Sequence, residues 1–335
     1  MSSPLLTVST SPHWLGRTTI RSMHLEFMLA LAPALITGFY YFGFPGLSVV
    51  LLTVASALVT EIIAVRVTSL PNRIHDLHAV LLGLLLGLIL PAGVPWWIPV
   101  VGGALTIILG KMVFGGLGNY PMNPVLVAWV ALSLSWPEHM NAYFAPVALG
   151  SGGDFAVTET PLMALKNDIG SLEIFELWDL WVGNAPGAIG ATGSLALIAG
   201  GLYLIIRRLI PWQIPVGALL GCVLMSLVAA YTDSRLLEMG MEGLAANLKV
   251  AWFHLATGGL MITAFFLAPE PVSSPVTPWG ALIFGLGVGV MTVIVRTWGA
   301  WVDGAFYAVL LLNTLTPILD RIRPKVLGKV ISGAV

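Results

Sequence analysis

The chain has 335 residues, of which 57% are hydrophobic and 9% charged, whereas about a quarter of the residues in an ordinary globular domain are charged. So few charges cannot cover a water-soluble surface, and the net charge of −1 gives no support for nucleic-acid binding. The single cysteine, Cys222, excludes an internal disulfide and a four-cysteine metal or iron–sulfur site. We therefore expect an all-α integral membrane protein, because a helix satisfies its own backbone groups in lipid.

Apolar runs of membrane-spanning length follow one another along the chain, separated by Gly, Pro and charged residues. They predict about ten transmembrane helices, at 26–43, 46–65, 77–92, 95–113, 122–136, 194–211, 213–231, 250–268, 277–296 and 302–319. A Gly- and acid-bearing segment interrupts this pattern. The predicted order is an N-terminal segment at 1–25, a five-helix repeat at 26–136, an extramembrane segment at 137–193, a second five-helix repeat at 194–320 and a tail at 321–335.

The distribution of Lys and Arg predicts the orientation, since these residues are retained on the cytoplasmic side. A cytoplasmic N-terminus places eleven of them inside and four outside, which puts both termini in the cytoplasm and 137–193 outside. Five spans per half would give the halves opposite orientations, as in inverted repeats. His78 and His254, each followed by a glycine five residues later, support such a repeat, although so short a match also arises by chance.

Acidic residues at membrane depth are candidates for an ion or proton pathway. Glu61 lies late in the second predicted span and Asp303 opens the tenth. The alternative for Glu61 is a pairing with Arg66 at the membrane boundary, and for Asp303 it is a favourable place at a helix N-terminus. His78 and His254 are relay or ligand candidates, but a histidine in a helical bundle more often hydrogen-bonds a neighbour, so we expect no metal site.

Two glycine-rich breaks and one loop complete the candidates. The break at 114–124 permits close backbone approach to a ligand or forms a plain re-entrant turn. The break at 184–193 precedes the sixth span, where free N–H groups could meet an anion. Neither has the GxGxxG spacing after a strand, which excludes a dinucleotide fold. In the loop 154–162, Thr160 is expected to cap a short helix that begins at Pro161.

At these residues the sequence resembles the RnfD/NqrB family, which comprises the membrane protein RnfD of the Rnf electron-transport complex and its relative NqrB of the sodium-pumping NADH:quinone reductase. The resemblance covers nearly the whole chain. It rests on the ten-span plan, Gly-Gly-Leu-Gly…Asn-Pro at 115–124, Gly-x-Ile-Gly-x-Thr at 187–192 and Asp-Gly at 303–304. Family members carry flavin mononucleotide (FMN) esterified through its phosphate to a threonine, in the pattern Asp-x-x-Ser/Thr-Gly-Ala-Thr followed by Pro-Leu. The matching terms here are Asp154, Thr160, Pro161 and Leu162, while Val157, Thr158 and Glu159 depart from the pattern.

The resemblance implies covalent FMN at Thr160, outside the cytoplasm, and leaves room for a second, non-covalent flavin. Thr192 ends a tetrapeptide like the flavin motif, but Gly193 follows it instead of Pro-Leu, so it ranks second. The further cofactor-binding residues implied are Asp154, Gly115, Gly116 and Asn123.

In function, the resemblance implies a redox subunit that relays electrons between ferredoxin and NAD in a Na⁺- or H⁺-translocating complex of the bacterial cytoplasmic membrane. Such a subunit is not catalytic alone, and its partners are the iron–sulfur and flavin subunits of the complex. The alternative from another class is a solute channel or transporter built on an inverted repeat, without flavin. In that case the glycine breaks would line a substrate path.

Overall fold

The computed structural model describes residues 19–68, 74–150, 153–167, 175–232 and 244–322. These residues are helical or irregular, and the pairings between extended residues among them are two isolated bridges, Pro91 with Ala188 and Phe144 with Val157. Four helices are long and apolar enough to cross a membrane, and a bent pair of helices is a fifth candidate. The all-α membrane class is thereby confirmed. The other predicted spans correspond to one arm of a long helix or to shorter apolar helices.

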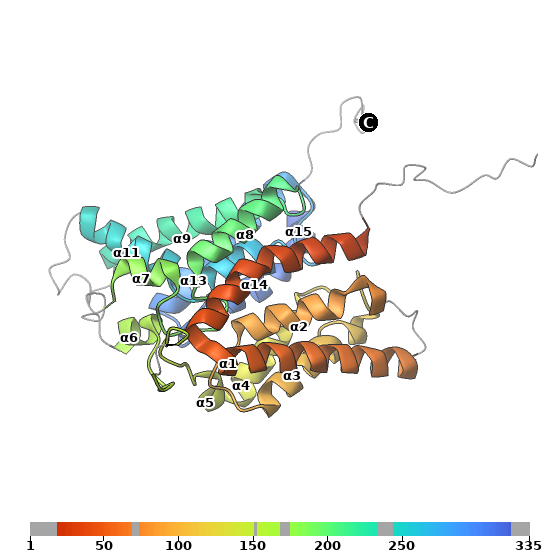
Figure 1. Ribbon diagram of the computed structural model, residues 1–335. Helices are drawn as coiled ribbons and strands as arrows, with labels where there is room; N and C mark the ends of the chain where they lie inside the picture. Colours follow the sequence, from red (N-terminus) through yellow and green to blue (C-terminus); the bar gives the residue numbers. More distant parts are fainter. Residues whose placement is uncertain (1–18, 69–73, 151–152, 168–174, 233–243, 323–335) are drawn as a thin grey trace, which may run out of the picture.

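Helix α1 (Ile20–Thr68) contains the first two predicted spans and is broken at Gly43. Gly43 has φ 54° and ψ −145°, a conformation that residues with a Cβ essentially never adopt. The chain therefore reverses there, and the two arms of α1 run back toward the same end of the molecule (Figure 1).

The second arm of α1 is the centre of the first half. After η1 (Ile74–Asp76) come α2 (His78–Ile89), α3 (Trp97–Ile108), η2 (Met112–Phe114), α4 (Pro124–Ser135) and α5 (Pro137–Met140). Both α2 and α3 pack on this arm, and α4 packs on α3. A Cβ at Gly83 or Gly87 would lie 2.8 Å from a backbone Cα of α1, so glycine is what allows α2 to approach so closely.

The second half has the same pattern of packing. Its helices are α8 (Ser194–Ile206), α9 (Gln213–Thr232), α11 (Leu244–Ala256), α12 (Leu260–Ile262), the π-helix η4 (Thr263–Leu267), α13 (Pro278–Thr297), α14 (Ala305–Asn313) and α15 (Thr316–Leu319). Here α9 packs on α11 and α13, and α14 packs on α13. The α9–α13 contact runs through glycines four residues apart, at Gly217 and Gly221 and at Gly285 and Gly289, the small-residue spacing typical of membrane helix pairs.

The predicted span 250–268 is not one straight helix. The chain bends by 66° between its two helical parts, 247–256 and 260–267. The bend at 257–259 exposes backbone groups that a continuous helix would have paired, and it forms part of the wall of the cavity described below.

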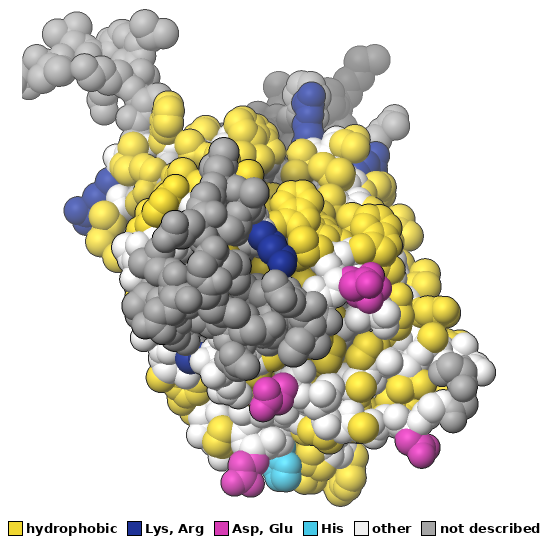
Figure 2. All heavy atoms as spheres, turned by 90° about the vertical axis from the view of Figure 1, so that its left-hand side faces the viewer, with side chains coloured by type: hydrophobic (Ala, Val, Ile, Leu, Met, Phe, Trp, Pro, Cys, Tyr) yellow, Lys and Arg dark blue, Asp and Glu magenta, His cyan; other side chains and the backbone are white. Residues whose placement is uncertain are grey.

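The helices α6 (Pro161–Asn167) and α7 (Leu177–Val182) lie with α5 at one end of the molecule, whereas α15 and the start of α1 lie at the other (Figure 1). The described residues of the segment 137–193 therefore gather at a single end. Figure 2 views that end, where acidic side chains lie among hydrophobic ones. Exposed carboxylates of this segment are Glu138, Asp154, Glu159 and Glu176.

Candidate functional site

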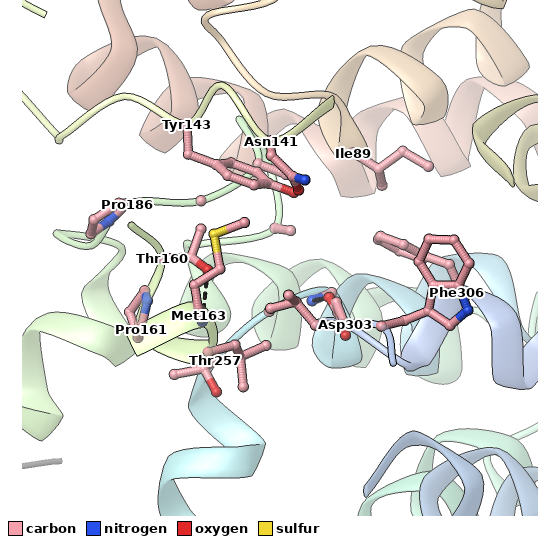
Figure 3. Close-up of a pocket in the computed structure, with 18 of the residues that line it drawn as sticks. Ile89, Asn141, Tyr143, Thr160, Pro161, Met163, Pro186, Thr257, Asp303 and Phe306 are labelled. Atoms are coloured by element: carbon pink, nitrogen blue, oxygen red, sulfur yellow. Dashed lines mark hydrogen bonds between the residues drawn. The ribbon is translucent and has the colours of Figure 1, made fainter. Parts of the chain in front are cut away.

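A cavity of about 260 Å³ lies where the 137–193 segment meets the helices. We call it the Thr160 cavity. Its walls come from the end of α4, the start of α6, the break at 185–192, the bend at 257–259 and the segment 300–307. Figure 3 shows Tyr143 and Asn141 on one side of this space and Asp303 and Thr257 on the opposite side, with Thr160 toward one end and Phe306 toward the other.

Thr160 is the buried residue of the stretch 153–160. It is 8% exposed and lines the cavity, while Asp154, Thr158 and Glu159 face solvent. Its Oγ1 accepts a hydrogen bond of 3.2 Å from the Met163 backbone N–H, at the start of α6. The predicted cap at Thr160 and helix start at Pro161 are confirmed, and the local fold turns this hydroxyl into the cavity.

Aromatic side chains form the wall at the other end. The Trp129 ring lies 4.6 Å from that of Phe306 and 5.5 Å from that of Tyr307, measured between centroids. Trp301 stacks on Tyr307 at 4.9 Å. The Tyr307 hydroxyl is held by a hydrogen bond of 3.0 Å with Ser133 Oγ. A wall of this kind suits the flat face of an aromatic ligand.

An ion pair joins the two sides of the bend at 257–259. Arg296 donates to the backbone oxygens of His254, at 2.7 Å, and Thr257, at 3.0 Å, and also to Asp303 Oδ1, at 3.0 Å. Asp303 Oδ2 accepts the N–H of Gly259, at the start of the next helical part. Arg296 therefore lies at the C-terminal end of one helical part, and Asp303 lies at the N-terminal end of the next. The helix dipole favours a cation at the first of these ends and a carboxylate at the second.

The break at 184–193 crosses the end of α2. The N–H of Ile189 donates to Leu90 O at 3.2 Å, and the N–H of Gly190 donates to Leu88 O at 2.7 Å. These two N–H groups are therefore engaged and not free for an anion. They satisfy the last carbonyls of the short helix α2, which is why that helix can end inside the fold. Thr192, also in this break, lines the Thr160 cavity.

The Thr160 cavity thus brings together Thr160, Thr192 and Asp303, and leaves the other candidates elsewhere. Glu61 is buried against Lys111, with 2.6 Å between Oε1 and Nζ and with both side chains 3% exposed. The partner of Glu61 is therefore Lys111 and not Arg66. Lys111 is engaged in this ion pair in turn.

A second cavity, of about 200 Å³, contains His78 in its wall. We call it the His78 cavity. Apolar side chains from α1, α2 and η4 surround most of it, and the polar residues that line it are His24, His78, Tyr120, Asn123 and Glu270. None of these residues lines the Thr160 cavity.

A hydrogen-bonded chain runs along this second cavity and joins the two halves of the protein. The Tyr120 hydroxyl donates to Glu270 Oε1 at 2.7 Å and lies 3.3 Å from His78 Nε2. Glu270 Oε2 accepts from the backbone N–H and the hydroxyl of Ser273, both at 2.8 Å. The imidazole Nδ1 of His78 is buried without a partner among the described residues.

Sequence reasoning missed His24, Tyr120 and Ser273 as members of this cluster. Glu270 did give a signal, because it is an acidic residue between two predicted spans, 250–268 and 277–296, in a stretch without Lys or Arg. Asn123 caps α4 by accepting from Val125 N and donates to Leu267 O, each at 2.9 Å. Gly115 and Gly116, at φ 95° and 97°, form the turn after η2 and line neither of the two cavities.

Comparison with known proteins identifies relatives over nearly the whole length of the chain. The model of the NQR2, RnfD, RnfE family matches residues 7–328. The D subunit of the Na⁺-translocating ferredoxin:NAD⁺ oxidoreductase complex of Acetobacterium woodii is 37% identical, over 94% of this chain and 93% of its own. The D subunit of the proton-translocating ferredoxin:NAD⁺ oxidoreductase complex of Clostridium ljungdahlii is 35% identical, over 95% and 94%. The D subunit of the ion-translocating oxidoreductase complex of Stutzerimonas stutzeri is 33% identical, over 93% of each chain.

Proposed function

Because the chain belongs to the NQR2, RnfD and RnfE family, whose relatives are subunits of ion-translocating oxidoreductase complexes, we propose that it is the flavin-carrying membrane subunit of such a complex, with FMN esterified to Thr160. The observation that carries this proposal is the placement of Thr160. Thr160 is the one buried residue of the stretch 153–160, and it lies in the wall of a cavity with an aromatic far end.

The residues of the Thr160 cavity fit a phosphate-linked flavin. Thr160 supplies the ester oxygen, and Trp129, Phe306 and Tyr307 supply flat apolar surface for the ring system. Residues 186–188 bring a Pro-Gly-Ala backbone to the wall without bulky side chains. Glu159, which departs from the attachment motif, is exposed. Water therefore screens its charge from a phosphate on the next residue.

The flavin would supply the ability to exchange one or two electrons. The chain's own residues would position it, exclude water and adjust its surroundings. With a single cysteine, buried Cys222, this chain cannot hold an iron–sulfur cluster on four cysteines. Ferredoxin and NAD chemistry therefore belongs to other subunits of the complex, among them iron–sulfur and flavin proteins, and this chain acts as a relay between them.

The His78 cavity is our proposed place for the second, non-covalent flavin. Its polar edge offers hydrogen-bonding groups, including the unpartnered Nδ1 of His78. It also lies close to the first cavity along α2, because Leu85 lines the His78 cavity and Ile89 lines the Thr160 cavity. Four residues of helix correspond to a rise of about 6 Å. Two flavins in these cavities would be near enough in the fold to pass electrons from one end of the protein toward the other.

We further propose that the chain lies in the bacterial cytoplasmic membrane as ten spans in two inverted five-helix repeats. The packing supports this proposal, since in each half the second helix contacts the third and the fourth, and the fourth contacts the fifth. The Lys and Arg distribution supports an orientation with both termini in the cytoplasm and the 137–193 segment outside. For ion movement we propose Glu61, whose Oε2 is buried without a partner among the described residues, with Asp303 as the second candidate.

The test is in-gel flavin fluorescence of the denatured full-length protein, co-expressed with a flavin transferase. We expect a fluorescent band that Thr160→Ala abolishes, because that substitution removes the ester oxygen. Thr158→Ala, an exposed threonine in the same loop, and Thr192→Ala are the matched controls and keep the fluorescence. A dark band from the unmodified sequence refutes the covalent attachment, and solute flux through the purified protein in vesicles would then favour a channel or transporter.

A further inference from the structure

The Arg296–Asp303 ion pair is turned so that its negative end faces the Thr160 cavity. The Arg296 side chain is 1% exposed, and that of Asp303 is 17% exposed. Asp303 lines the cavity, and Arg296 is not among the lining residues. A ligand in this space therefore lies nearer to the carboxylate than to the guanidinium. In a site shielded from bulk water that difference in distance counts, because charge interactions there are screened weakly.

The carboxylate cannot turn away from the cavity without breaking the bend at 257–259. Its Oδ1 accepts from Arg296 and from the Ala305 N–H, at 3.0 and 3.3 Å. Its Oδ2 accepts from the Gly259 N–H. Arg296 in turn is held by two backbone oxygens, those of His254 and Thr257. The charge of Asp303 is thus fixed in position before any ligand is bound.

The influence of this charge extends across the cavity. Tyr143 projects from the opposite wall (Figure 3), in the segment 137–193. Burial raises the pKa of its phenol above the usual value, and the negative charge of Asp303 raises that pKa further. Asp303 therefore disfavours additional negative charge within the cavity that separates these two residues.

We propose that Asp303 is a positioning residue that lowers the reduction potential of the flavin attached at Thr160. The inference rests on the proposed function. Electrons added to the flavin increase the negative charge near a fixed carboxylate, so the carboxylate raises the free energy of the reduced form relative to the oxidised form. A flavin with a lowered potential passes its electrons on more readily. Asp303 would thus favour onward electron transfer from the flavin.

The test compares reduction potentials of the covalently attached flavin in the full-length protein, measured by spectroelectrochemical titration. Asp303→Asn keeps an oxygen that can accept from Arg296 but removes the negative charge and leaves Arg296 uncompensated. Both changes act in the same direction, so we expect the potential to shift to a more positive value. Glu176→Gln, at an exposed position at the same end, is the matched control and leaves the potential unchanged.

Equal potentials in the flavin-bearing Asp303→Asn and unmodified proteins would overturn the inference while leaving the proposed function intact. An unmodified protein without covalent flavin would instead refute the proposed function. If Asp303→Asn does not accumulate with flavin, infrared difference spectra of protein carrying isotope-labelled aspartate give the second test. Flavin reduction should then perturb a carboxylate band that Asp303→Glu removes, and a difference spectrum without such a band contradicts the proposal.

Discussion

The buried pair of Glu61 and Lys111 permits a quantitative test of the fold. The two side chains are each 3% exposed, and Nζ lies 2.6 Å from Oε1. The substitution Lys111→Met would leave the Glu61 carboxylate buried with no cation beside it, and its second oxygen already has no partner among the described residues. Removing one partner of a buried pair costs about 3–5 kcal/mol. We expect a loss of stability of that size.

The same reasoning predicts recovery in the double variant. Glu61→Gln together with Lys111→Met leaves no buried charge, and replacing a whole buried pair is often neutral or stabilising. Unfolding in mixed micelles, followed by helical circular dichroism, measures all three variants. The matched control is Arg207→Met, which breaks the surface pair of Arg207, 54% exposed, with Glu26, and should cost far less. A Lys111→Met protein as stable as this control, or a double variant as unstable as the single one, would refute the reasoning.

Two further substitutions test the packing between parts of the chain. Gly200→Ala should destabilise the protein by about 1–3 kcal/mol, because the new Cβ would overlap the backbone oxygen of Ala30 in α1. The control Ala199→Val, at the exposed neighbouring position, should be nearly neutral in the same unfolding assay. Equal losses of stability in the two variants would contradict the close helix contact. Tyr120→Phe should lower the free energy of unfolding by about 1.5–3 kcal/mol, because it removes a hydrogen-bond donor to the buried Glu270 carboxylate. Its control is Tyr231→Phe, at a residue that is 64% exposed. An unaffected unfolding midpoint for Tyr120→Phe would show that this bond does not hold the halves together.

Local signals in the sequence predicted the positions of breaks and caps well. Glycine and proline mark the reversal at Gly43, and the Thr-Pro pair marks the start of α6 at Pro161. Both features depend on backbone geometry within a few residues, so composition reveals them. Covalent flavin at Thr160 was an expectation from the resemblance to the family's attachment motif, and the structure adds that this residue is the buried one of the stretch 153–160.

Features that depend on distant residues could not be predicted in this way. Hydropathy treats 250–268 as one span, but the bend at 257–259 is stabilised by Arg296, the last residue of the predicted span 277–296. A buried arginine is tolerated there because it pairs with Asp303 and bonds the carbonyls that the bend leaves open. Similarly, Glu61 and Lys111 are 50 residues apart, and no local pattern connects them.

Peptide mass spectrometry of the protein co-expressed with a flavin transferase is the most direct test of the central claim. We expect a proteolytic peptide containing Thr160 to carry the added mass of one FMN less one water, and fragmentation to assign this mass to the Thr160 side chain. A peptide of unmodified mass, or an adduct on Thr192 in place of Thr160, would contradict the claim.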